Sequence, residues 1–225
     1  MVQSQQAVLF VLTSTKTMGE GGKPTGAWLE EFTVPYYPIR DAGLLADIAT
    51  TAGGAVPFDP RSTESGSADI PENSRFRADP ELQAAIQTTL SVEQLRFGDY
   101  AAIFLPGGHG TMWDFPNSTA LGRGVSDIFA AGKTVAAVCH GPAGLVGAIA
   151  PDGRPFVAGR WVSAFTTEEE VALGLKKAVP FLLDERLASL GARIVKGGNF
   201  VTTAVVDSRL TPDKTRNPHM QPQHC

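Results

Sequence analysis

The sequence predicts a single α/β domain in which a mostly parallel sheet carries helices on both faces. Short continuous apolar runs recur along the 225 residues, and stretches of helix length separate them. Each run closes at a turn rich in glycine or in small polar residues. Strands that alternate with helices in this way build parallel sheets, because a crossover helix returns the chain to the end of the sheet where the preceding strand began.

The individual elements of the amino-terminal two thirds follow from this alternation. Strands are expected at residues 7–12, 100–105 and 134–138, since unbroken apolar runs of this length are typical of strands buried on both faces. Helices are expected at residues 28–41, 80–90 and 121–131. A further helix is expected after Cys139, where a proline starts a segment that runs to residue 148.

The last third is predicted to be less regular. A helix is expected at residues 180–190, which begin with proline, space leucines by four and three residues, and stop at Gly191. Weaker strands are expected at residues 193–196 and 200–206. The polar stretch at residues 57–80, rich in proline, serine and aspartate, is expected to be a surface excursion.

Composition and charge restrict the classes of function. A chain with 43% hydrophobic and 19% charged residues belongs with ordinary soluble globular proteins. A net charge of -4 without long runs of one sign argues against nucleic acid and anionic membrane surfaces as partners. The two cysteines provide no disulfide framework, and no basic leader or membrane-spanning apolar stretch is present. We therefore expect a cytoplasmic protein with small-molecule or protein partners.

The strongest chemical signal is the segment at residues 134–144. An apolar strand runs directly into Cys139, and the small residues from Gly141 to Gly144 permit a tight reversal into a helix, which is the geometry of a nucleophile elbow. A thiol over a helix N-terminus is expected to have a lowered pKa. The alternative is a cysteine that only packs in the core, but a packing cysteine needs no such turn.

A second glycine-rich turn follows the strand at residues 100–105. In a parallel sheet this turn, Pro-Gly-Gly-His-Gly at residues 106–110, would lie beside the elbow at the carboxyl ends of the strands. We expect the backbone N–H groups of Gly108 and His140 to form an oxyanion hole, with His109 in the substrate site. Taken alone, the turn would be an ordinary glycine turn.

The two turns together resemble the ThiJ/PfpI superfamily, which is similar to class I glutamine amidotransferases. Within it they resemble the heat-shock-chaperone branch of glutathione-independent glyoxalases. The resemblance is carried by Ala-Ala-Val-Cys-His-Gly-Pro at residues 136–142 and by Gly-Gly-His-Gly-Thr-Met-Trp-Asp-Phe-Pro at residues 107–116. It extends from about Val8 to about Leu210 and implies a flavodoxin-like three-layer sandwich.

Glu31 is the first candidate acid. Helical spacing puts it on a largely apolar face beside Phe32, where burial would raise its pKa and let it exchange protons with Cys139. By resemblance, the glutamate six residues after a Thr-Gly pair, here Thr25, is the general acid/base of the glyoxalase branch. Glu30 is the competing candidate, and exposure of both glutamates to solvent is the alternative.

Glu170 is the second candidate acid. Residues 166–170 place a threonine three positions before a glutamate in two registers, so the spacing alone favours a helix-capping role for Glu170. The resemblance implies instead that Glu170 orients His140 in a Cys139–His140–Glu170 triad. Whether His140 contributes its imidazole or only its backbone N–H is left open by the sequence.

The resemblance implies a cofactor-independent glyoxalase, a lyase of the D-lactate dehydratase type, that acts on methylglyoxal and related 2-oxoaldehydes. Its product would be a 2-hydroxy acid such as D-lactate, formed through a Cys139 hemithioacetal. The alternatives are a stress holdase that binds unfolded client proteins and a protein deglycase. A cysteine peptidase or amidase is less favoured, because the His-x-Glu of amidotransferases has no counterpart at residues 218–221.

The resemblance fades after Asp207. Residues 208–225 contain three prolines and no apolar periodicity, so we expect no helix there. We expect one α/β domain over residues 1–210 and an irregular tail over residues 211–225. The relatives have a last helix that this tail is expected to lack, and a homodimer that depends on that helix would be affected. His219, His224 and Cys225 in this tail could suggest a metal site, but we predict no metal.

Overall fold

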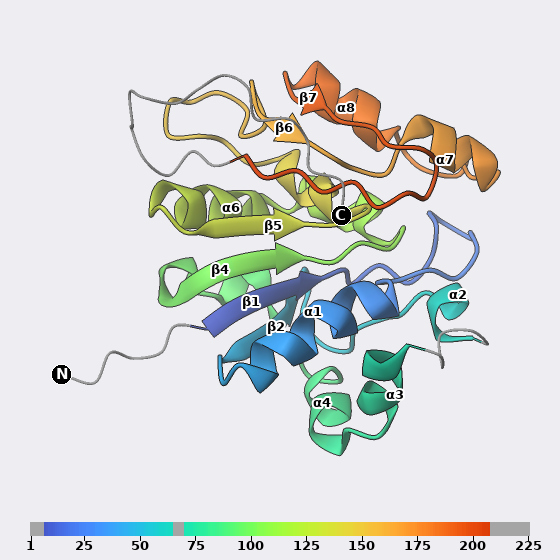
Figure 1. Ribbon diagram of the computed structural model, residues 1–225, viewed down its shortest axis with the longest axis vertical. Helices are drawn as coiled ribbons and strands as arrows, with labels where there is room; N and C mark the ends of the chain where they lie inside the picture. Colours follow the sequence, from blue (N-terminus) through green and yellow to red (C-terminus); the bar gives the residue numbers. More distant parts are fainter. Residues whose placement is uncertain (1–6, 65–69, 208–225) are drawn as a thin grey trace.

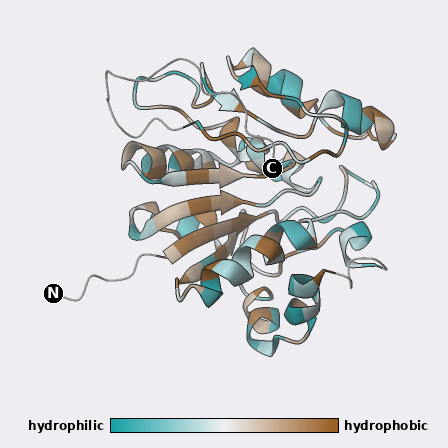
Figure 2. Cartoon of the chain, in the orientation of Figure 1, coloured by the Kyte–Doolittle hydropathy of each residue, from teal (hydrophilic) through white to brown (hydrophobic). Residues whose placement is uncertain are grey.

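The central sheet of the computed structural model is parallel and has five strands, in the order β3-β2-β1-β4-β5 (Figure 1). The structure describes residues 7–64 and 70–207. β1 and β4 lie inside the sheet, which explains why both are apolar along their length; Figure 2 shows them in brown. The strands are β1 (Ala7–Leu12), β2 (Ala46–Thr50), β3 (Leu90–Ser91), β4 (Tyr100–Leu105) and β5 (Thr134–Ala137).

Helices cover both faces of this sheet and complete the predicted three layers. α1, α3 and α4 contribute to the core on one face, and α6, η5 and α8 contribute to the core on the other. The helices of this part are α1 (Leu29–Asp41), α2 (Pro60–Thr63), α3 (Pro71–Arg77), α4 (Pro80–Ala85), η2 (Val92–Gln94), η3 (Phe97–Asp99), α5 (Thr111–Asp114), η4 (Phe115–Asn117), α6 (Thr119–Ala130) and η5 (Gly141–Leu145).

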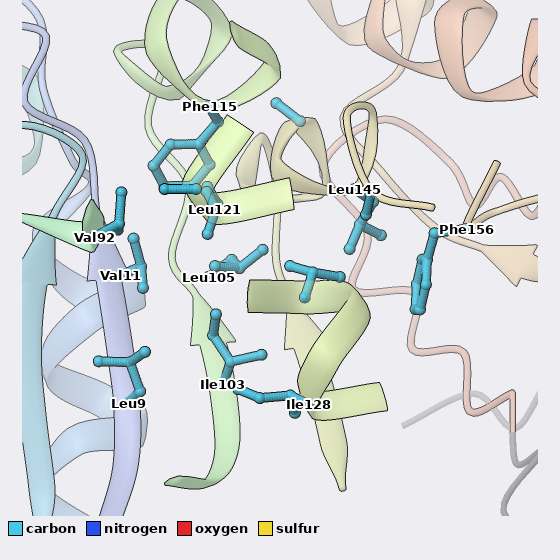
Figure 3. Close-up of a cluster of buried hydrophobic side chains, with 14 of the residues drawn as sticks. Leu9, Val11, Val92, Ile103, Leu105, Phe115, Leu121, Ile128, Leu145 and Phe156 are labelled. Carbon is cyan, nitrogen blue, oxygen red and sulfur yellow. The ribbon is translucent and has the colours of Figure 1, made fainter. Parts of the chain in front are cut away.

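Alternating side chains of β1 supply both cores. Leu9 and Val11 belong to the core on the α6 side, where Figure 3 shows them with Ile128 of α6. Phe10 and Leu12 belong to the core on the α1 side. Side chains of successive strand residues point to opposite faces, so a continuous apolar run is what a strand between two helix layers requires.

Aromatic packing fixes the rotation of α1 against the sheet. The rings of Phe32 and Tyr36 lie 5.8 Å and 5.7 Å from the ring of Phe10, both in edge-to-face arrangements. Residues three and four apart share a helix face, so this contact commits one side of α1 to the core. It also sets the direction in which the preceding residue, Glu31, leaves the helix.

The last third of the described chain adds a second, two-stranded sheet. This part of the chain contains β6 (Trp161–Val162), α7 (Thr167–Ala172), α8 (Leu183–Ser189) and β7 (Arg193–Ile194), and the two strands of the second sheet are β6 and β7. Among the described residues, no helix combines the length and the hydropathy that crossing a bilayer requires.

Several predicted elements are shorter than expected. The helix predicted at residues 80–90 ends at Ala85, because Thr89 pairs with Gly54 and Leu90 enters β3. The helix predicted after Cys139 is only the 3-10 helix η5, in a stretch where three glycines in seven residues disfavour an α-helix. β5, which leads into Cys139, is the last strand of the five-stranded sheet and only partly buried, not a fully buried strand.

Other expectations are corrected in the carboxy-terminal third and in the polar stretch. The helix predicted at residues 180–190 begins at Leu183, and residues 200–206 form no strand. The stretch at residues 57–80 is more than a surface excursion, because its α3 packs against α1 and buries Phe76. The predicted tail at residues 211–225 lies outside the described residues, so the domain boundary stays a prediction.

Candidate active site

A nucleophile elbow carries Cys139, as the sequence predicts. Its φ of 56° lies in the left-handed region that residues other than glycine rarely adopt. Hydrogen bonds hold the turn on both sides: Gly141 N–H donates to the Val138 carbonyl at 2.7 Å, and Phe165 N–H donates to the Cys139 carbonyl at 2.9 Å. Such a conformation costs on the order of 1–3 kcal/mol and persists where the surroundings fix it, as at reactive residues.

The glycine turn after β4 lies against the elbow, as the pairing of β4 with β5 requires. A Cβ atom on Gly107 would lie 2.7 Å from Glu31 Oε2 and 2.9 Å from Cys139 Cβ, so only glycine fits there. The backbone N–H groups of Gly108 and His140 donate to the Cys139 sulfur. The two expected oxyanion-hole donors are thus gathered at the sulfur.

Glu31 reaches the sulfur from α1. Its Oε2 atom accepts a hydrogen bond from Gly107 N–H at 2.8 Å, and its carboxyl group also forms a hydrogen bond with Cys139. Burial raises the pKa of Glu31 to about 7, the two hydrogen bonds act to lower it, and the charge of Glu30 raises it further. The expected helix face is therefore the observed one, and Glu30 lines the same cavity.

The thiol of Cys139 has a raised pKa, which contradicts the expected lowering. Burial raises it well above its ordinary value and the Glu31 carboxylate adds to this, while the N–H groups of Gly108 and His140 act in the opposite direction. The expected lowering depended on a full helix after the elbow, and the five residues of η5 provide little dipole. Cys139 lines the cavity and is only partly buried by exposed area, but the closely packed protein atoms around its sulfur leave a thiolate poorly hydrated.

His140 lies on the other side of the sulfur. Its Nδ1 atom is 3.2 Å from Cys139 Sγ, and its Nε2 atom is 2.8 Å from Glu170 Oε1. Burial lowers the pKa of His140 to about 4, so the imidazole is neutral at pH 7. A neutral imidazole that donates from Nε2 to a carboxylate presents the lone pair of Nδ1 to the thiol. The imidazole of His140 is therefore engaged, as well as its backbone N–H.

Glu170 is buried and does not cap α7. Burial acts to raise its pKa, but hydrogen bonds from His109 and His140 lower the pKa of Glu170 to about 2. The capping box is formed by Thr166 and Glu169, where Glu169 N–H donates to Thr166 Oγ1 at 3.2 Å and Thr166 N–H donates to Glu169 Oε2 at 2.8 Å. The capping interpretation of Glu170 was wrong, because the box uses the first of the two possible registers.

The side chain of His109 also reaches Glu170, a contact that the sequence did not suggest. His109 Nε2 lies 3.3 Å from Glu170 Oε2, and His109 Nδ1 lies 3.2 Å from an amino nitrogen of Arg61. Arg61 is in turn paired with the buried Asp59, at 2.7 Å. Sequence reasoning missed Arg61, because it belongs to the stretch expected to be a surface excursion.

A cavity of about 890 Å³ opens at Cys139. It is lined by polar side chains that include Glu31, His109 and His140, and by apolar and aromatic side chains from loops and helix ends: Trp28, Phe165, Leu173, Val195, Phe200 and Val201. This combination of a few convergent polar groups with an apolar wall is typical of small-molecule sites. The described residues could therefore hold a small carbonyl compound against the sulfur.

A metal or cofactor is not required by this arrangement. Among the described residues, the group of His and acidic side chains whose ligand atoms lie close enough to share an ion is His109, His140 and Glu170. Their facing atoms are joined to one another in hydrogen bonds, so they are not assigned as ligands. His219, His224 and Cys225 lie outside the described residues, and the absence of a metal stays a prediction.

The fold and the elbow define a member of the DJ-1/PfpI family, and the chain belongs to that family. A sequence profile of the DJ-1/PfpI family matches residues 25–211. A relative named glutathione-independent glyoxalase hsp3101, from Schizosaccharomyces pombe, is 30% identical over 162 residues, which are 70% of this chain and 66% of the relative.

Solved structures agree with this assignment. The Rapid Encystment Protein 24 kDa of Francisella tularensis superposes with a TM-score of 0.84 at 35% identity, covering 90% of this chain and 88% of that protein. The structure of glyoxalase III from Candida albicans superposes with a TM-score of 0.79 at 26% identity, again covering 90% of this chain and 88% of the other. The flavodoxin-like three-layer fold implied by the resemblance is therefore confirmed.

Proposed function

We propose that this protein is a glutathione-independent glyoxalase that converts methylglyoxal and related 2-oxoaldehydes into 2-hydroxy acids. The observation that carries the proposal is the contact between Cys139 and Glu31, whose pKa of about 7 suits proton transfer at neutral pH. Relatives and a solved structure that bear the name glyoxalase support an enzyme of this kind.

The first step would join the sulfur to the aldehyde. The Cys139 sulfur attacks the aldehyde carbon to form a hemithioacetal, and the thiol proton passes through the Glu31 carboxylate to the former carbonyl oxygen, which becomes a hydroxyl group and leaves Glu31 ionised again. The N–H groups of Gly108 and His140, which donate to the sulfur, are close enough to stabilise charge on that oxygen. His140 Nδ1, 3.2 Å from Sγ, is a second acceptor within reach of the thiol hydrogen, besides the Glu31 carboxylate.

The next steps would move one proton between two carbons. The Glu31 carboxylate removes the proton from the former aldehyde carbon, and the ketone oxygen takes up a proton as the electrons form an enediol. The same carboxyl then returns the proton to the neighbouring carbon, while the hydroxyl group on the sulfur-bearing carbon loses its proton and becomes the thioester carbonyl. The product is a thioester of the 2-hydroxy acid, and water cleaves it to release the acid and the thiol. The sum is methylglyoxal plus water to lactic acid, so no cofactor or oxidant is consumed.

Several finer statements are part of the same proposal. The D configuration of the lactate and the lyase class, of the D-lactate dehydratase type, follow from the resemblance described above. The cytoplasmic location, the absence of nucleic-acid and membrane partners, and a homodimer stay predictions.

The proposal is tested by incubating purified protein with methylglyoxal and measuring D- and L-lactate with enantiospecific assays. Wild type should form D-lactate without added glutathione, and Cys139→Ser, with an unchanged melting temperature, should form almost none. Wild-type protein that consumes no methylglyoxal, or a Cys139→Ser variant that keeps full turnover, contradicts the proposal.

A holdase is the second candidate, and the exposed apolar rim of the cavity favours it. Leu173, Phe200 and Val201 line the cavity and are 43%, 58% and 59% exposed. A holdase needs this surface and not the thiol, so suppression of a client protein's thermal aggregation should survive Cys139→Ala. A deglycase would use the same thiol on a glycated protein. A peptidase or amidase is less favoured, because it would give Glu31 no part in the reaction.

A further inference from the structure

We propose that His109 and Arg61 are positioning residues that act through Glu170, so that the group behind the nucleophile is a chain of five residues rather than a triad. The chain runs Arg61, His109, Glu170, His140, Cys139, and each neighbouring pair is within hydrogen-bond distance. The inference rests on the proposed glyoxalase function for its catalytic consequence, but its geometry does not depend on the substrate.

The hydrogen-bonded series of five residues begins at Arg61, whose guanidinium is held in place by Asp59. Asp59 is fully buried and accepts two hydrogen bonds from the Arg61 guanidinium, Nε to Oδ1 at 2.9 Å and an amino nitrogen to Oδ2 at 2.7 Å. Thr25 Oγ1 donates to the same Oδ2 at 2.9 Å. A guanidinium held in this bidentate way has little freedom to rotate, so its position beside His109 is set by α2 and its cap.

The hydrogen-bond directions along the chain follow from Arg61. A guanidinium can only donate, so His109 Nδ1 must be the acceptor. In a neutral imidazole the hydrogen then resides on Nε2, which faces Glu170 Oε2. Glu170 therefore receives one N–H on each oxygen, from His109 on Oε2 and from His140 on Oε1. This leaves His140 Nδ1 without a hydrogen and directed at Cys139.

Loss of the His109 donor would affect His140 in two ways. Glu170 Oε2 would be left buried without that partner, so the carboxylate would gain rotational freedom. The His140 ring also contacts the His109 ring, with centroids 4.1 Å apart, and stacks on the Phe165 ring, 4.2 Å away. His109 therefore holds both the partner and the plane of the imidazole that faces the thiol.

The test compares substitutions that keep or remove each donor. His109→Gln keeps an N–H near the Nε2 position, whereas His109→Leu removes it at similar volume. For methylglyoxal, His109→Leu should lower kcat by about 10- to 100-fold, the effect of losing one hydrogen bond to a buried charge, with little change in KM. His109→Gln should recover most of the loss. A role in packing alone predicts equal kcat for both variants.

A second readout does not need turnover. The rate at which iodoacetamide alkylates Cys139 at fixed pH depends on the orientation of His140, so it should change in His109→Leu and return toward wild type in His109→Gln. If wild type shows no glyoxalase activity but the alkylation rates follow this order, the proposed function fails and the positioning chain stands.

Arg61, whose own side chain is 41% exposed, provides a second variant, and because Arg61→Met leaves the buried Asp59 without its guanidinium, its melting temperature is compared with that of wild type. Arg61→Met should lower kcat and change the alkylation rate in the same direction as His109→Leu but less, because His109 is then free to adopt its other tautomer. Arg96→Met, which removes an exposed arginine from a loose pair with Asp99 at 3.7 Å, is the matched control. The proposal is overturned if folded His109→Leu and Arg61→Met both keep the wild-type kcat and alkylation rate.

Discussion

The α1 side and the α7 side of Cys139 each supply one glutamate, and the two carboxyl groups behave in opposite ways. Burial raises the pKa of Glu31 to about 7, whereas the pKa of Glu170 falls to about 2 although burial alone would raise it. Glu31 accepts one backbone N–H and faces a thiol with Glu30 nearby, while Glu170 accepts N–H groups from two imidazoles. Burial dominates the pKa of Glu31, whereas the hydrogen bonds from the two imidazoles outweigh burial in the pKa of Glu170.

This difference assigns separate tasks to the two acids. A carboxyl with a pKa near the working pH can both accept and return a proton, which the hydrogen shift between two carbons requires. A carboxylate that stays ionised over the whole physiological range cannot exchange protons, but it can hold a histidine in one tautomer. The comparison therefore predicts proton transfer by Glu31 and orientation by Glu170.

The largest expected effect concerns Glu31. Glu31→Gln keeps the shape but removes the proton-transfer group, so kcat for methylglyoxal should fall by about 1000-fold. Steady-state kinetics of the purified variant measure this. Glu30→Gln, one residue away in the same cavity, is the matched control and should keep most of the activity. Equal losses in the two variants would mean that the contact between Glu31 and the sulfur is not the catalytic one.

Local chemistry explains what the sequence could predict about the site. The elbow and the glycine turn each lie within about a dozen residues. Their tight backbone turns require small residues, so both can be recognised from the local sequence alone. The three-layer fold follows from the alternation of apolar runs. β2 escaped prediction because Asp47 interrupts its short apolar pattern.

Contacts between distant segments explain what could not be predicted. Arg61 lies 48 residues from His109 in the chain, and only the packing of α2 near the glycine turn brings them together. For Glu170, two registers of one motif were compatible with the sequence, and the tertiary contact with two histidines selected between them. The pKa of Cys139 is raised by burial and by Glu31, a residue 108 positions earlier in the chain, and the sequence alone shows neither effect.

The second prediction uses the pH dependence of stability, where the two acids should act in opposite directions. Glu31 has a raised folded-state pKa, so its contribution is present below pH 4.5 and is lost as the pH rises through about 7. Glu170 has a lowered pKa, so its contribution is present above pH 4.5 and is lost as the pH falls toward about 2. Each change should be on the order of 2 kcal/mol.

Urea unfolding of wild type, Glu31→Gln and Glu170→Gln between pH 3 and pH 8 would measure these contributions. The free energy of unfolding of wild type minus that of Glu31→Gln should change with pH above pH 4.5. The free energy of unfolding of wild type minus that of Glu170→Gln should change with pH below pH 4.5. Parallel curves for all three proteins would show that the two environments do not differ as the contacts indicate.

A smaller effect is expected on the thiol itself. The carboxylate of Glu31 is one cause of the raised pKa of Cys139, so Glu31→Gln should shift the pH profile of Cys139 alkylation by iodoacetamide to lower pH. Burial remains in the variant, so the shift should be partial. Cys225→Ser serves as the common background, because it removes the other cysteine. An unchanged pH profile would mean that burial alone raises the pKa of Cys139 and that the Glu31 carboxylate does not affect it.

The smallest expected effect separates the roles of Glu169 and Glu170 in α7. Thr166 and Glu169 form the capping box, whereas Glu170 faces the histidines, so Thr166→Ala should act on stability and not on chemistry. Loss of a threonine cap lowers the free energy of unfolding by about 1 kcal/mol. Chemical denaturation would measure this, and kcat should stay near the wild-type value because the first turn of α7 is also held by Glu169 Oε1, which accepts the Phe200 N–H at 2.8 Å. A fall in kcat like that expected for His109→Leu, without a loss of stability, would mean that the Thr166 cap also orients Glu170. The assignment of Glu169 to capping and of Glu170 to catalysis as separate roles would then be wrong.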